Sequence, residues 1–364
     1  MLRIRHAVVG LCLVIALGIA AIAQNVRYEI PFPSLDAEHQ TLVCDFHMHT
    51  VFSDGSVWPP VRIDEAWRLG LHALSITDHI EYQPHKDDVP TKHERPYELA
   101  FGAARTHNLI LIKGAEITRD TPPGHFNAIF LTDIAALDHP DLMEVMRRAN
   151  EQGAFVFWNH PGWKGPELGR WGDVQQSLFE KGWLHGIEIA NGDTYYLEGH
   201  QYAMEKNLTL IGNSDIHRPD LDDRTTPERH RTMTLVFAKE RTAEGIKEAL
   251  QNRRTAVWFG NQLIARREIL EPFFYRCLVV EPPHVRGRDV VWAIFRNQSY
   301  VDIVLERTGP VGPASIVVPA QGAVVVRIGT PQPKAALELV YKVVNFIIEP
   351  NVSLPVTLTL PGAQ

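Results

Sequence analysis

Two histidines separated by one residue, His47 and His49, form the clearest chemical pattern in this chain. They follow a short apolar run, 42–46, which predicts a buried β-strand. Side chains on one face of an extended chain recur at every second residue, so both imidazoles point into one space. Imidazoles are common ligands of divalent metals, and Asp54 adds a carboxylate in the Ser-Asp-Gly turn that follows. This stretch therefore predicts part of a metal site.

Further histidines and carboxylates stand where later predicted strands begin or end. Asp215 and His217 repeat the alternating spacing after a late strand, and Glu81 follows His79 after an early one. The candidate metal ligands are His47, His49, Asp54, His79, Glu116, His125, His160, Asp215 and His217. A single histidine is more often structural than a ligand. Because six histidines and three carboxylates recur at strand ends, the set predicts a polynuclear metal site.

The elements that must position these residues alternate between strand and helix from about residue 41 to 265. Apolar runs predict strands at 42–46, 73–77, 110–116, 127–131, 154–158, 186–189, 209–212 and 232–238. Amphipathic stretches predict helices at 61–69, 95–107, 141–152, 175–181, 199–206 and 242–251. This alternation indicates a parallel sheet covered by helices, and the number of units favours a barrel. A doubly wound sheet is disfavoured, because no Gly-rich phosphate turn follows an early strand.

After residue 270 the pattern changes to short β-rich runs broken by Pro, Gly and Asn. Strands are expected at 276–280, 289–295, 300–306, 314–318, 323–328, 337–346 and 352–360, with no helix between them. This spacing predicts a small antiparallel β-sandwich over residues 270–364. The sandwich holds no cluster of histidines or carboxylates, so we assign it no chemistry.

The first residues predict an export signal. Arg3 and Arg5 precede an apolar run at 7–21, and small residues at 21–23 offer a cleavage site, so we assign residues 1–23 to a signal peptide. An uncleaved membrane anchor is the alternative. We expect a periplasmic or secreted protein with no stable membrane span after cleavage. Residues 24–40 should form an extended lead-in, because Pro31 and Pro33 interrupt any regular pattern.

Composition sets broad limits on the partners. Hydrophobic residues make up 45% and charged residues 22%, which are ordinary values for a globular protein. The net charge of -7 argues against nucleic acid as the main partner, since such proteins normally carry a basic surface. Cys44 and Cys277 should be buried thiols rather than a disulfide framework. Nothing in the sequence indicates the oligomeric state.

The order of the motifs resembles that of the PHP family, named for polymerase-associated domains and histidinol phosphatases. The motifs are H-x-H-T-x-x-S-D-G from His47, T-D-H to His79, G-x-E to Glu116, G-H-F-N around His125, N-H-P around His160 and N-S-D-x-H to His217. The resemblance covers about residues 41–260. It implies a distorted (β/α)7 barrel that binds two or three divalent metal ions (Mn, Zn or Fe) and hydrolyses phosphoesters.

The resemblance also implies a division of the ligands among metals. One metal would take His47, His49, Glu116 and Asp215; a second would take Asp54, His79 and His217; a third would take Glu116, His125 and His160. Glu116 would bridge two of them. Many members of the family carry histidine where this chain has Asp54. An aspartate is an acceptable ligand, but the metal it holds can differ.

Together, these features lead us to expect an exported phosphoesterase acting on small phosphodiesters or phosphomonoesters by attack of a metal-bridging hydroxide. Asp54 and Asp215 would serve the catalytic centre, and Glu81 or His85 would protonate the leaving group. Expected substrate contacts are Arg218, Lys164 and Trp163, and the polar segment 82–94 should cover the mouth of the site. Two alternatives remain: a metallohydrolase acting on a C–N or C–O bond, and a non-enzymatic metal- or ligand-binding module.

Overall fold

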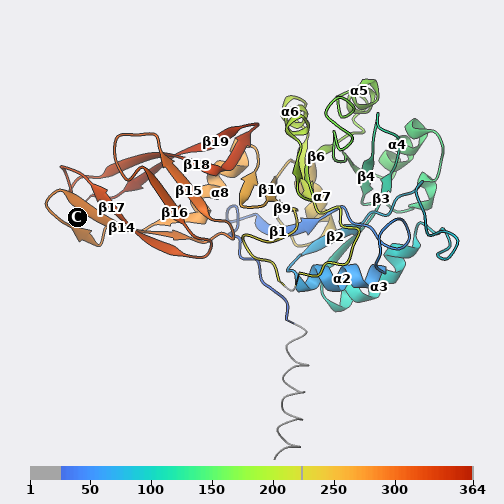
Figure 1. Ribbon diagram of the computed structural model, residues 1–364, viewed down its shortest axis with the longest axis horizontal. Coiled ribbons are helices and arrows are strands. Elements are labelled where there is room, and N and C mark those ends of the chain that lie inside the picture. Colours follow the sequence, from blue (N-terminus) through green and yellow to red (C-terminus); the bar gives the residue numbers. More distant parts are fainter. Residues whose placement is uncertain (1–25, 223, 363–364) are drawn as a thin grey trace, which may run out of the picture.

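A computed structural model of the chain describes residues 26–222 and 224–362. The predicted signal peptide, 1–23, lies outside the described residues. Figure 1 shows the α/β elements gathered on one side and the C-terminal strands, coloured orange to red, on the other. The α/β class with a C-terminal β domain is therefore confirmed.

The α/β part follows the predicted alternation closely. Its strands are β1 (Gln40–Asp45), β2 (Ala73–Ile76), β3 (Ile110–Ile117), β4 (Phe126–Ile129), β5 (Phe155–Trp158), β6 (Gly186–Asn191), β7 (Thr194–Tyr195), β8 (Thr209–Asn213) and β9 (Met233–Ala238). Its helices are α2 (Pro59–Arg68), α3 (Arg95–Thr106), η1 (Ala135–Leu137, a 3₁₀ turn), α4 (Leu142–Glu151), α5 (Asp173–Glu180), α6 (Leu197–Glu205) and α7 (Ala243–Gln251). Each predicted helix from 61 to 251 is present within two residues at each end.

The sheet is mixed rather than wholly parallel. β1, β2 and β3 pair in parallel, as do β5, β6 and β8, but β4 is antiparallel to both of its neighbours. Only the short segment 118–125 joins β3 to β4, and a parallel partner needs a crossover of roughly a dozen residues or more. The prediction of a parallel sheet was therefore wrong at β4.

No ladder closes the sheet between β8 and β1 in the part of the chain that is described. β9 lies antiparallel to β1 in this gap, and the Thr234 hydroxyl on β9 bonds both the N–H (3.0 Å) and the carbonyl (2.7 Å) of Gly212 on β8. Beyond the end of β1, Met48 forms an isolated parallel bridge with Ile216. A closed barrel is thus not confirmed, but the segments after β1 and β8 are held side by side.

The C-terminal part is a two-layer antiparallel sandwich, as predicted. Its strands are β12 (Leu278–Val280), β13 (Val285–Arg286), β14 (Val290–Asn297), β15 (Ile303–Arg307), β16 (Ser315–Val318), β17 (Ala323–Gly329), β18 (Leu337–Glu349) and β19 (Val352–Leu360). One layer has the order β16-β15-β18-β19, and in the other β12, β13 and β17 all pair with β14.

The two parts share one sheet and one core. The hairpin of β10 (Thr255–Phe259) and β11 (Gln262–Ile264) extends from β9, and β11 pairs in parallel with β18. Helix α8 (Arg267–Cys277) packs at this junction, where a strand had been expected from residue 276. Pro272 inside the helix removes one backbone donor and conceals the helical pattern, but the buried Phe273 and Phe274 stabilise it by packing.

The lead-in is extended and packed against this junction. Residues 26–39 contain no helix or strand, and the ring of Phe32 contacts those of Trp258 and Phe273 at centroid distances of 5.2 and 6.3 Å. Cys44 and Cys277 are free, buried thiols, as expected. None of the helices that the structure describes combines the length and apolarity needed to span a bilayer.

Candidate metal centre

The nine predicted ligands converge on one cluster. Their ligand atoms form four groups, in each of which all atoms lie within 4.8 Å of one another. The groups are His49, Asp54, His79 and His217; His47, His160 and Asp215; His47, His49 and Glu116; and His79, Glu116 and His125. His47, His49, His79 and Glu116 each belong to two of the groups. These shared residues link all four groups, so the groups form a single polynuclear centre.

The direction of the strands explains this convergence. Parallel strands bring the residues that follow them to one edge of the sheet, which places His47, His79, His160 and Asp215 together. His125 precedes its strand, but β4 runs in the opposite direction, so its beginning lies at the same edge. His160 and Asp215 adopt the left-handed backbone region, with φ of 29° and 52°. Non-glycine residues in this region often mark functional sites.

His47 is oriented by a carboxylate that the sequence analysis did not single out. Its Nδ1 lies 3.0 Å from Oε1 of Glu188 on β6, so Nε2 faces the cluster, 3.1 Å from Oδ1 of Asp215. Glu188 is fully buried and its Oε2 also accepts the backbone N–H of His160 at 3.0 Å. A carboxylate in the otherwise apolar strand Gly-Ile-Glu-Ile-Ala was the signal that could have identified it.

Asp54 lies at the centre of the group that it forms with His49, His79 and His217. Its Oδ1 lies 3.1 Å from His217 Nε2 and 3.4 Å from His79 Nε2. The ring of His49 stacks on that of His217 at a centroid distance of 4.1 Å. His49 Nε2 is also 3.3 Å from Glu116 Oε2. His49 therefore belongs both to the group of Asp54 and to the group of His47 and Glu116. The family resemblance assigned it to one metal alone, together with His47, Glu116 and Asp215.

Glu116, predicted to bridge two metals, belongs to two of the four groups. Its Oε2 is 3.0 Å from His79 Nδ1 and 3.2 Å from His47 Nε2, and its Oε1 is 2.9 Å from His125 Nδ1. The side-chain amide of Asn159 donates to Oε1 at 3.0 Å. An isolated parallel bridge between residues 79 and 116 continues the pairing of β2 and β3 up to these ligands. Both carboxylate oxygens are thus available to separate histidine groups.

The electrostatics of the cluster are those of closely packed ion pairs. Burial acts to lower the pKa of His79, but the charges of Glu116 and Asp54 outweigh it and raise the pKa to about 9. Burial likewise opposes protonation of His47, yet Asp215, Glu188 and Glu116 hold its pKa well above the ordinary value. Burial and the neighbouring charge of His79 lower the pKa of His49 to about 4.

The residues fit a bound cation. His49 Nε2, Asp54 Oδ1 and Asp215 Oδ1 are buried and have no hydrogen-bond partner among the described residues. His49 Nε2 and Asp215 Oδ1 lie 3.0 Å apart without forming a hydrogen bond, as ligands of a shared metal would. Unpaired buried polar atoms are costly, and a metal would satisfy them. The mixture of imidazole and carboxylate suits Zn, Mn or Fe better than Ca.

Two pockets open onto the cluster. The smaller, about 280 Å³, is lined by cluster residues together with Trp163, Asn191 and Tyr196. The larger, about 850 Å³, lies beside it and is lined by Tyr82, Arg119 and other residues. Asp54, His79, His125 and Trp163 border both pockets. The two spaces therefore form a continuous depression in front of the ligands.

Comparison with a solved structure identifies the family. A two-domain protein of Bacteroides vulgatus, described as containing a predicted PHP-like metal-dependent phosphoesterase, is 45% identical and has a TM-score of 0.87. The match covers 92% of this chain and 99% of that one. This chain belongs to the PHP family. A model of an Ig-like domain family, DUF5001, matches residues 278–359 of this PHP protein, in the C-terminal sandwich.

More distant similarities cover less of the chain. A proposed metal-dependent phosphoesterase of Bifidobacterium adolescentis is 17% identical with a TM-score of 0.39, over 57% of this PHP protein and 95% of its own chain. An uncharacterised protein of Methanocaldococcus jannaschii is 35% identical over 78 residues, which are 21% of this chain and 34% of that protein. This PHP protein therefore spans about a third of the length of the curated relative it matches.

The predicted substrate contacts are only partly brought to the site. The Trp163 ring lies 5.6 Å from that of His125, and Lys164 Nζ lies 4.8 Å from the centroid of Trp163, at the wall of the larger pocket. The side chain of Arg218 is exposed and lines neither pocket, and its backbone carbonyl accepts a hydrogen bond from Arg62. The structure does not bring Arg218 to the site.

The two predicted proton donors are not well placed either. Glu81 lines the larger pocket, but its carboxylate pairs with Arg119 and accepts the backbone N–H of Thr118 at 2.7 Å. Its oxygens are thus already used by donors of the protein itself. His85 is exposed and lines neither pocket. Arg119, which the sequence analysis missed, is a second cation beside Lys164 at the larger pocket.

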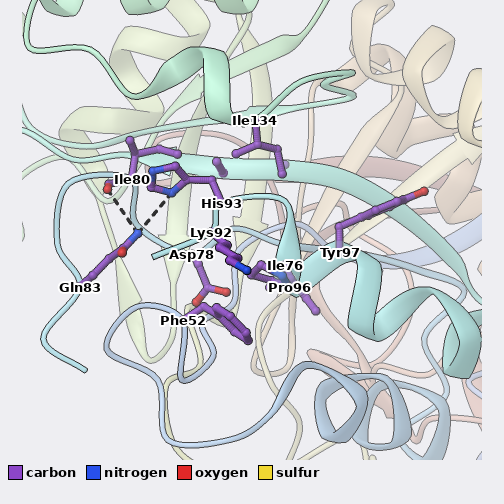
Figure 2. A pocket seen from close by; sticks show the side chains of 12 residues that line it. Phe52, Ile76, Asp78, Ile80, Gln83, Lys92, His93, Pro96, Tyr97 and Ile134 are labelled. Carbon is purple, nitrogen blue, oxygen red and sulfur yellow. Dashed lines mark hydrogen bonds between the residues drawn. The ribbon is translucent and has the colours of Figure 1, made fainter. Parts of the chain in front are cut away.

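The segment 82–94 reaches the site only at its beginning. Figure 2 shows Gln83 and His93 at the small cavity beside it, where the Gln83 amide donates to the Ile80 carbonyl and contacts Nδ1 of His93 at 3.2 Å. The same amide also donates to the carbonyl of His79, at 3.4 Å. Gln83 thus ties both ends of the segment to the residues that follow β2. Tyr82 lines the larger pocket, whereas Asp88 lines a separate one beside Trp58. The predicted cover over the mouth is confined to the first residues of this segment.

Proposed function

We propose that this PHP protein is an exported phosphoesterase that hydrolyses small phosphodiesters or phosphomonoesters with two or three divalent metals (Mn, Zn or Fe). The observation that carries the proposal is the convergence of nine imidazole and carboxylate ligands at the base of an open pocket of about 280 Å³. The relative with 45% identity, described as a predicted metal-dependent phosphoesterase, supports the same class of reaction.

The chain supplies ligands, walls and hydrogen-bond donors for this reaction. When bound, the metals would activate water and offset the negative charge of the phosphoryl oxygens. Asp54, Glu116 and Asp215 would offset part of the charge of bound metals, and the histidines would complete the ligand sets. Burial raises the pKa of Tyr196 to about 12, so its phenol stays protonated and can donate a hydrogen bond to a phosphoryl oxygen in the smaller pocket.

The larger pocket suits the leaving group. Its volume of about 850 Å³ is in the range of small-molecule sites, and it adjoins the ligands His79 and His125. Trp163 and Tyr82 offer aromatic surface, while Lys164 and Arg119 offer positive charge. The organic part of an alcohol leaving group would pack against the aromatic side chains, and a further acidic or polar substituent on it would contact the cations.

Kinetics with two substrates test the proposal. Protein purified without chelator should contain at least two metals per chain and cleave bis(p-nitrophenyl) phosphate or p-nitrophenyl phosphate. Replacing Glu116 by Gln should remove most of both the metal and the turnover, because this carboxylate contacts five histidines. A metal-loaded protein that cleaves no phosphoester of a broad panel would contradict the proposal and favour the alternative of C–N or C–O hydrolysis.

Two further measurements address the path of the reaction and the location of the protein. In water labelled with 18O, direct attack by water places the label in the released phosphate or monoester, whereas retention of label by the protein would contradict it. Export predicts that the mature protein recovered outside the cytoplasm begins near residue 24. Recovery of the full-length chain from the cytoplasm alone would contradict this part of the proposal.

A further inference from the structure

A fully buried arginine outside the ligand set, Arg62 on α2, joins the backbones of two segments that carry ligands. Its Nε donates to the carbonyl of His49 at 2.9 Å. Its two terminal nitrogens donate to the carbonyls of Ile216 at 3.1 Å and Arg218 at 2.8 Å. The side chain therefore spans from a ligand after β1 to both sides of His217.

The charge of Arg62 is balanced by a network that holds it in place. Nη1 donates to Glu65 Oε2 at 2.7 Å, and Oε1 of Glu65 accepts the backbone N–H of Asp220 at 2.8 Å. The Asp220 carboxylate is in turn held by Arg231, at 2.7 Å. The segment 216–220 is thus bonded to the same ion-pair network by backbone and side chain. With its position set in this way, the guanidinium can fix the distance between the three carbonyls.

The same network reaches the backbone that carries Asp215. Arg231 also lies 3.3 Å from Oδ2 of Asp45, and this oxygen accepts the Ser214 hydroxyl at 2.6 Å. Among the described residues the sheet forms no ladder here, and the isolated bridge between residues 48 and 216 is accompanied by two backbone hydrogen bonds, from the His49 N–H to the Ile216 carbonyl (3.0 Å) and from the Asp215 N–H to the His47 carbonyl (2.9 Å). Side chains, Arg62 among them, add contacts to this short backbone pairing.

We propose that Arg62 is a positioning residue that sets the spacing between His49 and the pair Asp215 and His217, and thereby the metal affinity of the group His49, Asp54, His79 and His217. The inference rests on the metal centre of the proposed function but not on its substrate. Arginine suits the task because its planar fork offers five donors in fixed directions. Lysine keeps the charge but presents its donors from one point, so it cannot bond three separate carbonyls in the same geometry.

The test compares Arg62→Lys with a matched control, Arg266→Lys. Arg266 is also a buried arginine that donates to two backbone carbonyls, those of Ala203 and Leu208, both at 2.9 Å. None of these residues belongs to the ligand groups. Metal-free full-length variants are titrated with Zn²⁺ in competition with a chromophoric chelator, the absorption spectrum of bound Co²⁺ is recorded, and melting temperatures are measured in parallel.

Arg62→Lys should weaken the binding of one metal by about 10- to 100-fold, the usual effect of losing a residue that orients ligands, and should change the Co²⁺ spectrum. Arg266→Lys should lower the melting temperature without changing either metal readout. Wild-type metal affinity and an unchanged spectrum in Arg62→Lys, with only a lower melting temperature, would overturn the inference.

A second variant covers the case in which Arg62→Lys does not fold. Glu65→Gln keeps Arg62 but removes its charge partner, and it should weaken the same metal several-fold; unchanged affinity in folded Glu65→Gln would also overturn the inference. Because these readouts need no substrate, the two hypotheses fail separately. A wild-type protein that binds metals but cleaves no phosphoester contradicts the proposed function and leaves the role of Arg62 intact.

Discussion

At the scale of single residues, the cluster depends on groups that orient the ligands as much as on the ligands themselves. Glu188 contacts a ring nitrogen of His47 and the backbone of His160 and accepts from the Asn213 amide at 2.8 Å. Such partners fix which imidazole nitrogen faces a metal and in what direction. The surrounding carboxamides, including Asn159 and Asn191, keep Glu116 and Asp215 from rotating away.

Replacing Glu188 by Gln should therefore lower metal affinity by about 10- to 100-fold, although Glu188 is itself outside the ligand groups. The amide would present an N–H₂ group to donors that now face an oxygen, so His47 would lose its fixed orientation. Chelator-competition titration measures the effect. Glu98→Gln, which disrupts an exposed ion pair with Arg95, serves as the control and should bind metal as the wild type does. Wild-type affinity in Glu188→Gln would contradict this role.

Removing the metals should destabilise the folded protein. Ligands that bind only the native state add about 4 kcal/mol when present at a thousand times their dissociation constant. Treatment with a strong chelator should lower the melting temperature by several degrees, and adding Mn²⁺ or Zn²⁺ back should restore it. In Glu116→Gln, which lacks the bridging carboxylate, the chelator should have a much smaller effect. A chelator-insensitive wild type containing bound metal would argue against a structural contribution.

At the scale of elements, the same pair of hydrogen bonds between a histidine and a valine recurs at the start of two parallel strands. His72 precedes β2 and His185 precedes β6, in the similar sequences Leu-His-Ala-Leu and Leu-His-Gly-Ile. Each histidine donates its backbone N–H to a single valine of the preceding strand, Val43 or Val156, and its Nδ1 accepts the N–H of the same valine. Each valine lies one residue before the first residue of its strand that pairs with the next strand. The imidazole thus satisfies a backbone donor at the point where the parallel pairing begins.

This pair of hydrogen bonds should make the protein sensitive to acid. Burial, aided by the charges of Arg241 and Arg27, lowers the pKa of His72 to about 4, below the value of about 6.5 in an unfolded chain. The unfolded state therefore binds more protons between these values, so stability is full above pH 6.5 and falls as the pH drops toward 4. At pH 5 the loss from His72 is about 2 kcal/mol.

His72→Asn keeps an acceptor for the Val43 N–H but does not titrate. Its free energy of unfolding, measured by chemical denaturation, should fall by about 2 kcal/mol less than that of the wild type between pH 7 and pH 5. Parallel pH profiles for His72→Asn and wild type would show that His72 does not titrate as described.

At the scale of the whole molecule, the two parts are joined by packing rather than by a loose linker. One hydrophobic core extends from Ile63 and Phe237 in the α/β part, through Phe273 on α8, to Leu360 in the sandwich. The pairing of β11 with β18 makes the larger sheet continuous across the junction. The sandwich therefore supports the α/β part even though its residues are absent from the ligand groups.

A chain ending at residue 265 should accordingly retain every ligand but lose stability. Deletion removes α8 and exposes Phe237 and Trp258, which are now fully buried. Large exposed apolar patches favour aggregation. Solubility and melting temperature of the shortened protein, compared with the full chain at equal metal content, measure the effect. A soluble shortened protein with the same melting temperature would show that the α/β part is an independent unit.

The sequence alone was sufficient for those features that local patterns encode. The alternation of apolar strands with amphipathic helices, the change to short strands after residue 270 and the positions of all nine ligands are visible without coordinates. Ligands could be recognised because alternate residues of an extended chain point to the same side, so the spacing of His47 and His49, or of Asp215 and His217, already places both side chains together.

Only the tertiary structure decided which partners those residues have. The reversal of β4, the role of Glu188, the helix around Pro272 and the span of Arg62 all depend on contacts between residues distant in sequence. The same holds for the exclusion of His85 and Arg218 from both pockets. Short-range patterns indicate which secondary structure a segment prefers. The contacts of its side chains depend on packing against distant segments, and the residues that determine this packing are spread over the whole chain.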